Sequence, residues 1–313
     1  MPRVVELAGG VGGAKLADGL QAAVGRDLTV IVNTGDDLER HGLDIWPDHD
    51  TVAYTLAGLD DEERGWGLAG ETWTVIDTLA GRGEDAWFRL GDRDIATHLV
   101  RTERLRRGER PTEVARALRA SLGVAATVLP MTDDEVRTEV RTPEGWLEFQ
   151  EYFVHRGQQP EVLEVRFRGL EAACITPEAR AAIEAAEVIV IAPSNPIVST
   201  GPILALPGVR EALGGATLRG TPIVAVSGIV GGRALRGPAD RMLATLGHEP
   251  TALGVARIYQ GVADRFVLDR VDEALVSEVE ALGMRTLVTD TIMTDDAARA
   301  RLAAEVLAFA VAA

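Results

Sequence analysis

The sequence has a single cysteine, Cys174, in 313 residues, which excludes a disulfide framework and any cysteine-rich metal site. Cys174 lies in an apolar segment, so we expect a small core residue and not a nucleophile. No apolar run approaches the roughly 18 residues that a membrane-spanning helix needs. The chain also opens directly into a strand-like segment, without the charged and apolar regions of a signal peptide. These absences predict a cytoplasmic protein without a membrane partner.

Basic residues are fewer than acidic ones, with 32 Lys and Arg against 48 Asp and Glu, for a net charge of −16. Such a surface repels nucleic-acid backbones and anionic membranes, so we expect no nucleic-acid partner. A polyanionic ligand would have to bind in a local basic or metal-lined pocket.

Lysine is nearly absent, because Lys15 is the sole lysine and every other basic residue is arginine. An ammonium is a compact point charge, whereas a guanidinium is a planar fork. Retention of one lysine at the start of a helix favours a functional ammonium there; the alternative is survival by chance.

What is present is the composition of an ordinary folded protein, with 46% hydrophobic and 26% charged residues. A chain of this length accommodates one large α/β domain with an insertion, or two domains. Residues 4–7 have the pattern of a buried strand, four glycines follow, and a helical pattern with Leu16 and Leu20 comes next.

A strand, glycine turn and helix present backbone N–H groups and a helix N-terminus to an anion. The glycines match neither G-x-G-x-x-G nor G-x-x-x-x-G-K-[ST], so we predict a phosphate-binding turn of another type. The candidate ligand-binding glycines are Gly10, Gly12 and Gly13. The alternative is a tight strand-to-helix crossover that binds no ligand.

Residues 28–32 form a second strand-like run that ends in Asn-Thr-Gly-Asp-Asp, which predicts a right-handed βαβ unit with parallel strands. Ligands of such sheets lie beyond the carboxyl ends of the strands. Two more apolar runs, 188–192 and 223–226, end in loops rich in Gly, Ser, Asn and Arg. We therefore expect one crevice, with the candidate binding residues Thr34, Ser194, Asn195, Ser199, Gly231, Gly232 and Arg233. Ordinary turns are the alternative, because the same residue types dominate turns.

Aspartates crowd the segment 36–50, and this density of oxygen ligands suits Mg²⁺. The candidate ligands are Asp36, Asp37, Asp48 and Asp50. For any single aspartate the alternative is a solvated turn or a cap; Asp48 or Asp50 would cap a helix that begins near Thr51.

The predicted fold class is α/β, a Rossmann-like doubly wound and mostly parallel sheet with an inserted helical region and an antiparallel extension. We predict a nucleotide-binding core at 1–60 and 171–313, and an insertion at 61–170 that contributes to an acceptor pocket. Helical patterns occupy the first part of the insertion, and alternating segments at 136–142, 146–153 and 162–168 predict antiparallel strands. Later strands are predicted at 253–256, 266–268 and 286–289 before a closing helix at 295–309. Within the insertion we expect Trp87 and Phe88 to be packing residues.

Six ordered motifs between residues 9 and 240 carry a family resemblance: GGVGGAKL, NTGDD, PDHDTVAYTLAG, WFRLGDRDIATHL, APSNPIVSTGPIL and SGIVGGRALRGPAD. Together they resemble the 2-phospho-L-lactate transferase family of deazaflavin coenzyme (F-420) biosynthesis. The resemblance implies magnesium-dependent transfer to 7,8-didemethyl-8-hydroxy-5-deazariboflavin (Fo). The implied donor is a guanylyl diphosphate carrying 2-phospholactate or its enolpyruvyl equivalent, and GMP leaves.

Carried over by motif, Asp50 and Arg89 resemble the deazaflavin contacts of the family, and the glycine turn with the loops SNPIVSTGP and GGRALRGP resembles its guanosine diphosphate side. The resemblance also implies a homodimer. Trp46 departs from the expected pattern; it either contacts the deazaflavin ring system or only packs.

For the chemistry, the terminal ribityl hydroxyl of Fo would attack the phosphorus that bears the lactyl or enolpyruvyl group. Charge neutralisation by Mg²⁺ with Lys15 or an arginine would assist the transfer, and one of the four candidate aspartates would orient or deprotonate the hydroxyl. The catalytic candidates are Asp48, Asp50 and Lys15. The sequence does not separate metal ligand from base, or lactyl from enolpyruvyl donor. The alternative function is a nucleotide-sugar-binding regulatory protein of the related glycine-turn group; a dehydrogenase is disfavoured by the missing dinucleotide fingerprint.

Overall fold

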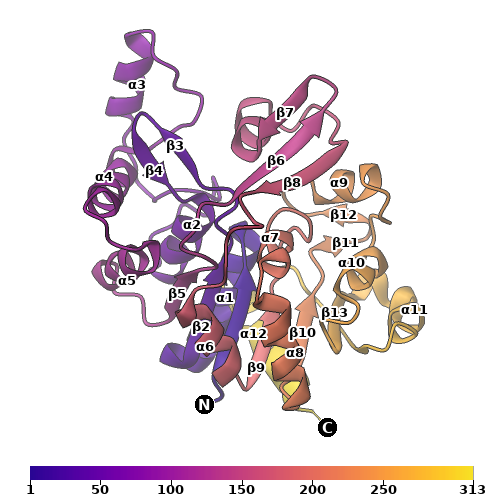
Figure 1. The fold of residues 1–313 in the computed structure, drawn as a ribbon. Coiled ribbons are helices and arrows are strands. Elements are labelled where there is room, and N and C mark those ends of the chain that lie inside the picture. The colour runs from indigo at the N-terminus through magenta and orange to yellow at the C-terminus, as the bar shows by residue number, and fades with distance from the viewer. Residues whose placement is uncertain (313) are drawn as a thin grey trace.

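A seven-stranded, wholly parallel sheet forms the centre of the computed structural model, which describes residues 1–312 (Figure 1). Across the sheet its strands are β14 (Arg285–Thr289), β13 (Arg265–Asp269), β10 (Ile223–Val226), β9 (Val188–Ile191), β1 (Val4–Ala8), β2 (Leu28–Val32) and β5 (Thr127–Pro130).

Helices cover both faces of this sheet because alternate strand residues point to opposite faces and both sets are apolar. On β1, Val5 and Leu7 pack into one core, whereas Val4 and Ala8 pack into the other. The Val4 face is covered by α1 (Gly10–Val24), α2 (Pro47–Leu56) and α12 (Asp296–Val311). The Leu7 face is covered by α6 (Pro177–Ala185), α7 (Thr200–Ala205), α8 (Val209–Leu218), α9 (Ala239–Thr245), α10 (Ala252–Tyr259) and α11 (Val276–Glu280).

The order of the sheet reverses between β1 and β9, because the chain builds β1, β2 and β5 in one direction and then β9, β10, β13 and β14 in the other. In an open α/β sheet such a switch point opens a crevice at the carboxyl ends of the strands. Both termini lie at the opposite end of the molecule, at the bottom of Figure 1. The predicted doubly wound fold is confirmed.

Smaller elements rise above the carboxyl edge of the sheet (Figure 1). An antiparallel sheet of order β7-β6-β8 projects there, as the sequence predicted. These elements are the hairpin β3 (Leu38–Arg40) and β4 (Leu43–Ile45), the helices α3 (Thr74–Gly81), α4 (Asp92–Arg106) and α5 (Pro111–Ser121), the strands β6 (Arg137–Thr142), β7 (Gly145–Glu148) and β8 (Glu164–Arg168), and the hairpin β11 (Ile229–Val230) and β12 (Arg233–Ala234).

One strand of the main sheet comes from inside the range 61–170, because β5 pairs with β2 along its whole length. The chain therefore returns to the central sheet between the helices α3 to α5 and the antiparallel strands. The division into a core and an insertion stays a prediction, with β5 belonging to the sheet.

Three local predictions are wrong. Residues 253–256 lie in α10, whose N-terminus is capped by the Thr251 side chain, and a short apolar run does not distinguish strand from helix. Residues 146–153 are only partly extended, because a helical turn, Glu151–His155, follows β7. Cys174 is exposed, and its backbone N–H donates to the Asp134 carboxylate at 3.0 Å. Among residues 1–312, none of the helices is both long and apolar enough to cross a membrane.

Candidate active site at the switch point

A cavity of about 820 Å³ opens at the carboxyl edge of the sheet, above β1 and β9. Its walls come from segments far apart in the chain: the glycine turn, the first turn of α2, the loop after β9, residues 235–239 and residues 291–294. The insertion contributes residues around Trp66 and Phe88, and Phe149 and Phe153 from the antiparallel region. The crevice expected from the strand order is present.

The glycines of the turn are needed for close packing. A Cβ on Gly12 would lie 2.3 Å from the Pro193 carbonyl oxygen, and one on Gly9 would lie 2.7 Å from Asp48 Oδ2. Gly10 has φ +64°, a conformation that favours glycine, and opens α1. Gly10 and Gly12 line the cavity, whereas Gly13 packs against Ala8 and is not among its lining residues.

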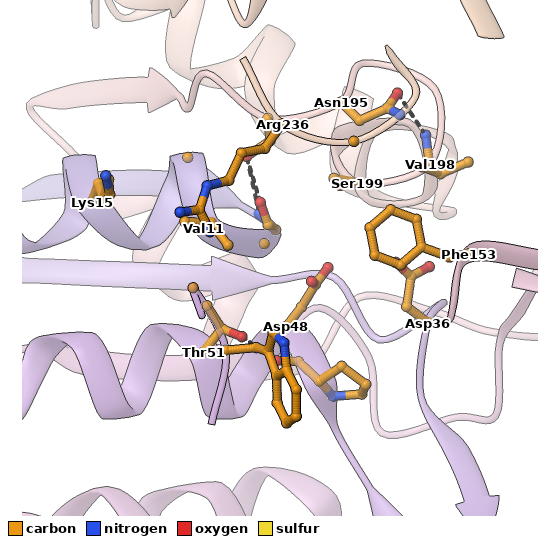
Figure 2. Close-up of a pocket in the computed structure, with 18 of the residues that line it drawn as sticks. Val11, Lys15, Asp36, Asp48, Thr51, Phe153, Asn195, Val198, Ser199 and Arg236 are labelled. Carbon is orange, nitrogen blue, oxygen red and sulfur yellow. Dashed lines mark hydrogen bonds between the residues drawn. The ribbon is translucent and has the colours of Figure 1, made fainter. Parts of the chain in front are cut away.

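The loop after β9 shapes this turn with its polar side chains. The Ser194 hydroxyl donates to the Gly9 carbonyl at 2.7 Å. Asn195 Oδ1 accepts from the Ile197 backbone N–H at 2.9 Å, so this side chain builds its own loop. Ser194, Asn195 and Ser199 all line the cavity. Asn195 and Ser199 are shown in Figure 2.

Asp48 lies at the centre of the cavity in the view of Figure 2, buried beside the glycine turn. Asn33 Nδ2 donates to its Oδ2 at 3.0 Å and also to the Val198 carbonyl at 3.2 Å. Burial raises the pKa of Asp48 to about 6, although the Asn33 amide and the Gly10 N–H lower it. Asn33, at the start of the Asn-Thr-Gly-Asp-Asp turn, thus connects this turn to α2 and to the loop after β9. It was not among the predicted site residues.

The other residues of that turn differ in position. Asp36 is buried and lines the cavity, and burial together with the charge of Asp48 raises its pKa well above the usual range. Burial likewise raises the pKa of Asp37. Neither Asp37 nor Thr34 is among the lining residues.

Asp48 and Asp50 do not cap α2, because this helix begins at Pro47 and holds both aspartates in its first turn. Asp50 is buried and lines the cavity. Burial alone would raise the pKa of Asp50, but the guanidinium of Arg101 outweighs it, helped by His49 and His98, and holds this pKa below the usual range. The pKa values of Asp48 and Asp50, two aspartates of one helical turn, are therefore shifted in opposite directions.

Within residues 1–312, one group of three buried side chains has ligand atoms within 4.8 Å of one another and so could hold a metal ion: Asp50, Asp94 and His98. Arg101 donates to both Asp50 and the His98 ring, so a cation already occupies part of this space. Asp36, Asp37 and Asp48 do not join Asp50 in such a group.

Three aspartates, Asp36, Asp48 and Asp50, form an acidic side of the cavity, and this side suits a hard cation. Asp36 Oδ1 and Asp50 Oδ2 are buried oxygens without a hydrogen-bond partner, and both residues line the cavity. Mg²⁺ takes one or two carboxylates and completes its coordination with water and phosphate oxygens. These donor atoms therefore fit Mg²⁺.

A basic side faces these acids. Lys15 lines the cavity, and its Nζ donates to the Met293 carbonyl at 2.9 Å. Burial lowers the pKa of Lys15, and the positive charges of Arg299 and Arg236 lower it further. In Figure 2 the Arg236 side chain extends toward Val11 at the start of α1. Among the described residues, neither Lys15 nor Arg236 forms an ion pair with a carboxylate.

Arg236 lines the cavity, whereas the predicted binding residue Arg233 does not. Gly231 and Gly232 form the two-residue turn between β11 and β12, with φ of +57° and +77°. The Gly231 N–H donates to Asp272 Oδ2 at 3.0 Å. Gly231, Gly232 and Arg233 are not among the lining residues.

The remaining wall is aromatic. Trp87, Phe88, Phe149 and Phe153 line the cavity. Phe88 also packs against the cluster of Leu38, Ile45 and Leu90, and the Trp87 ring stacks on His155, as expected of packing residues. Arg89 also lines the cavity, although its Nη1 donates to Asp77 at 2.7 Å. Such a wall suits a flat, largely apolar ring.

The chain is similar to known proteins over nearly its whole length. The family model described as "2-phospho-L-lactate transferase CofD" matches residues 4–307. A phosphoenolpyruvate transferase of Streptomyces griseus is 46% identical over 315 residues, covering 98% of each chain. A 2-phospho-L-lactate transferase of Methanosarcina mazei is 39% identical over 292 residues, covering 93% of this chain and 95% of its own.

Solved structures show the same fold. A Bacillus halodurans protein superposes with a TM-score of 0.63 at 17% sequence identity, covering 98% of this chain and 99% of its own. A second crystal structure from that organism, described as a member of the UPF0052 family, gives a TM-score of 0.62 at 15% identity, covering 97% of this chain and 98% of its own.

Proposed function

Since the chain belongs to the 2-phospho-L-lactate transferase CofD family, we propose how its cavity divides between the two substrates of the family reaction. The protein is a transferase that moves a phospholactyl or phosphoenolpyruvyl group to Fo in coenzyme F-420 biosynthesis. The observation that carries our assignment is one cavity with an acidic side, a basic side and an aromatic wall.

The acceptor Fo lies against the aromatic wall formed by Trp87, Phe88, Phe149 and Phe153. Stacking and apolar burial bind its flat ring system there. Asp50, which lines the same cavity, accepts the hydrogen bond of the terminal ribityl hydroxyl. Its second oxygen, Oδ2, has no other hydrogen-bond partner and is available for this role.

The guanosine diphosphate part of the donor lies at the glycine turn, where Gly10, Gly12, Lys15 and Arg236 supply N–H groups and positive charge. The phosphate that is transferred, which bears the lactyl or enolpyruvyl group, then lies between the basic and acidic sides, and the phosphate of the departing GMP lies at the glycine turn. Two cations without a carboxylate partner need an anion, and the donor diphosphate supplies one.

Mg²⁺ would be held by Asp36, whose buried Oδ1 has no hydrogen-bond partner within residues 1–312, with Asp48 beside it. When bound, it neutralises phosphate charge during transfer. The residues of the chain orient the hydroxyl toward phosphorus, keep Lys15 and Arg236 on the donor phosphates, and exclude water through the aromatic wall. The proton of the attacking hydroxyl passes to a carboxylate of the acidic side, and GMP departs from the glycine turn.

We assign the enolpyruvyl form of the donor. Relatives at 43–46% identity are named phosphoenolpyruvate transferase, whereas the two from Methanosarcina at 39% identity are named 2-phospho-L-lactate transferase. The homodimer expected from the resemblance stays a prediction.

The test incubates purified protein with Fo, Mg²⁺ and either the phosphoenolpyruvyl or the phospholactyl guanylyl donor, and weighs the products by mass spectrometry. We expect the dehydro product to form faster at equal donor concentration. Faster turnover of the phospholactyl donor would overturn the donor assignment but not the arrangement of the site. Fo fluorescence that does not change on adding protein would contradict the proposed acceptor pocket.

A further inference from the structure

Arg101 of α4 is a fully buried arginine, with 0% of its surface exposed. Its Nη2 donates to Asp50 Oδ1, and its Nη1 donates to the Asp44 carbonyl at 3.2 Å and lies 2.9 Å from His98 Nδ1. A buried ion pair often adds little stability, because desolvation offsets the attraction. Stability alone therefore does not account for the buried contact between Arg101 and Asp50.

The contact with Arg101 makes the two oxygens of Asp50 unequal. Oδ1 receives Arg101 and lies 3.5 Å from His49 Nδ1. Oδ2 is buried, has no hydrogen-bond partner within residues 1–312, and lies 3.7 Å from His98 Nδ1. Because Asp50 lines the cavity, Oδ2 is the oxygen that remains for a ligand.

Trp46 packs against the guanidinium of Arg101. The Arg101 Cζ lies 4.4 Å from the centroid of the Trp46 ring. Trp46 is buried in a small core with Val114, Ala115 and Leu118, and its carbonyl accepts from the Asp50 N–H at 2.9 Å. The residue whose role the sequence left open therefore packs, and it joins the start of α2 to the guanidinium of α4.

A second set of contacts joins the same two helices. Tyr54, one turn after Asp50 on α2, donates to Asp94 Oδ1 at 2.6 Å. Asp94 Oδ2 lies 3.4 Å from His98 Nε2. Spacings of four and three residues place Asp94, His98 and Arg101 on one face of α4, directed at α2.

We propose that Arg101, backed by Trp46, is a positioning residue that holds Asp50 with Oδ2 presented to the attacking hydroxyl. This rests on the proposed contact between Asp50 and the acceptor. A planar fork that is bonded to three partners and lies over an indole ring fixes direction as well as charge, which an ammonium cannot do. Misplacement of a reacting group by about 1 Å costs roughly 10²-fold in rate.

The first test replaces Arg101 by lysine, which keeps the charge and loses the fork. We expect kcat to fall roughly 10²-fold, while Fo affinity, followed by Fo fluorescence, changes less than about threefold. The matched control is Arg104→Lys on the same helix, because Arg104 pairs with Glu109 at 2.6 Å and does not line the cavity. Arg104→Lys should retain full turnover.

The second test is a double-mutant cycle with Asp50→Asn. If Arg101 acts through Asp50, the variant carrying both changes loses no more turnover than Asp50→Asn alone. Arg101→Ala should also regain turnover when guanidinium chloride is added below denaturing concentration, whereas a variant that is merely destabilised would lose more.

Full turnover of Arg101→Lys, or losses that multiply in the cycle, would overturn the proposal. Full turnover of Asp50→Asn by itself would overturn the proposed contact between Asp50 and the acceptor. The single variant therefore tests the proposed function separately from the role of Arg101. Should the Arg101 variants not fold by thermal melting, Trp46→Leu keeps the ion pair but removes its backing. We expect a several-fold loss of kcat that disappears in the Asp50→Asn background, and no loss would count against the proposal.

Discussion

The two sides of the cavity are built in opposite ways. On the acidic side, Asp48 and Asp50 are buried and bonded to Asn33 and Arg101. On the basic side, Lys15 is half-buried and Arg236 exposed, and their polar contacts in the described chain are to backbone carbonyls. The acids are fixed before any ligand arrives, whereas the cations lack a counter-ion. The difference indicates a rigid side for positioning the reacting groups and a basic side that is completed by an anionic substrate.

Asp50→Asn should have the largest effect. The change keeps the shape of the side chain but removes the negative charge facing the acceptor, so we expect turnover to fall by roughly 10³-fold or more. Thermal melting checks that the fold is intact. The control is Asp37→Asn, because Asp37 does not line the cavity and should matter little. An equal loss in that control would restore Asp37 to the metal-binding set.

Arg236→Ala tests the basic side. A hydrogen bond to a charged group contributes about 1.5–3 kcal/mol, so KM for the guanylyl donor should rise roughly 10- to 100-fold, with Fo affinity unchanged. Arg233→Ala is the matched control three residues away, because Arg233 is exposed and outside the cavity lining. If Arg233→Ala raised KM for the donor more than Arg236→Ala, the assignment of Arg236 to the basic side would be contradicted.

Lys15→Ala should have a smaller effect on the same side. Its Nζ already bonds to the Met293 carbonyl, and partly exposed charges contribute about 1 kcal/mol or less, so donor affinity should fall by a few-fold. Calorimetry with GDP measures this directly. Unchanged affinity would favour chance as the reason that one lysine survives.

Glu6 provides a contrast to the acids of the cavity, since it is buried on β1 and neither carboxylate oxygen has a hydrogen-bond partner. Burial raises its pKa well above the usual range. Above the pKa of the unfolded state, the unfolded chain releases this proton while the folded chain keeps it, so stability falls as pH rises. The isosteric change Glu6→Gln removes this titration, and its melting temperature relative to the unmodified protein should increase by a few degrees between pH 5 and pH 8. An exposed control, Glu171→Gln, should follow the unmodified protein, and parallel curves for Glu6→Gln would show that Glu6 does not destabilise the fold.

The sequence by itself determined the framework of the protein. The parallel strands, the turns at their carboxyl ends and the shared crevice follow from local patterns, because apolar periodicity and glycine placement act within a few residues. The antiparallel extension was predicted on the same grounds. The family was also predicted from the sequence, because it is recognised by the order of its motifs along the chain.

The tertiary structure alone decided which side chains meet. Asp50 and Arg101 are separated by 51 residues, and their contact depends on the angle at which α4 packs against α2. The spacing of Asp94, His98 and Arg101 places them on one face of α4, but it does not show that this face contacts α2. Arg236 lines the cavity, whereas Arg233, on the second strand of the β11–β12 hairpin, is exposed and does not. Such choices rest on long-range packing, which no local pattern encodes.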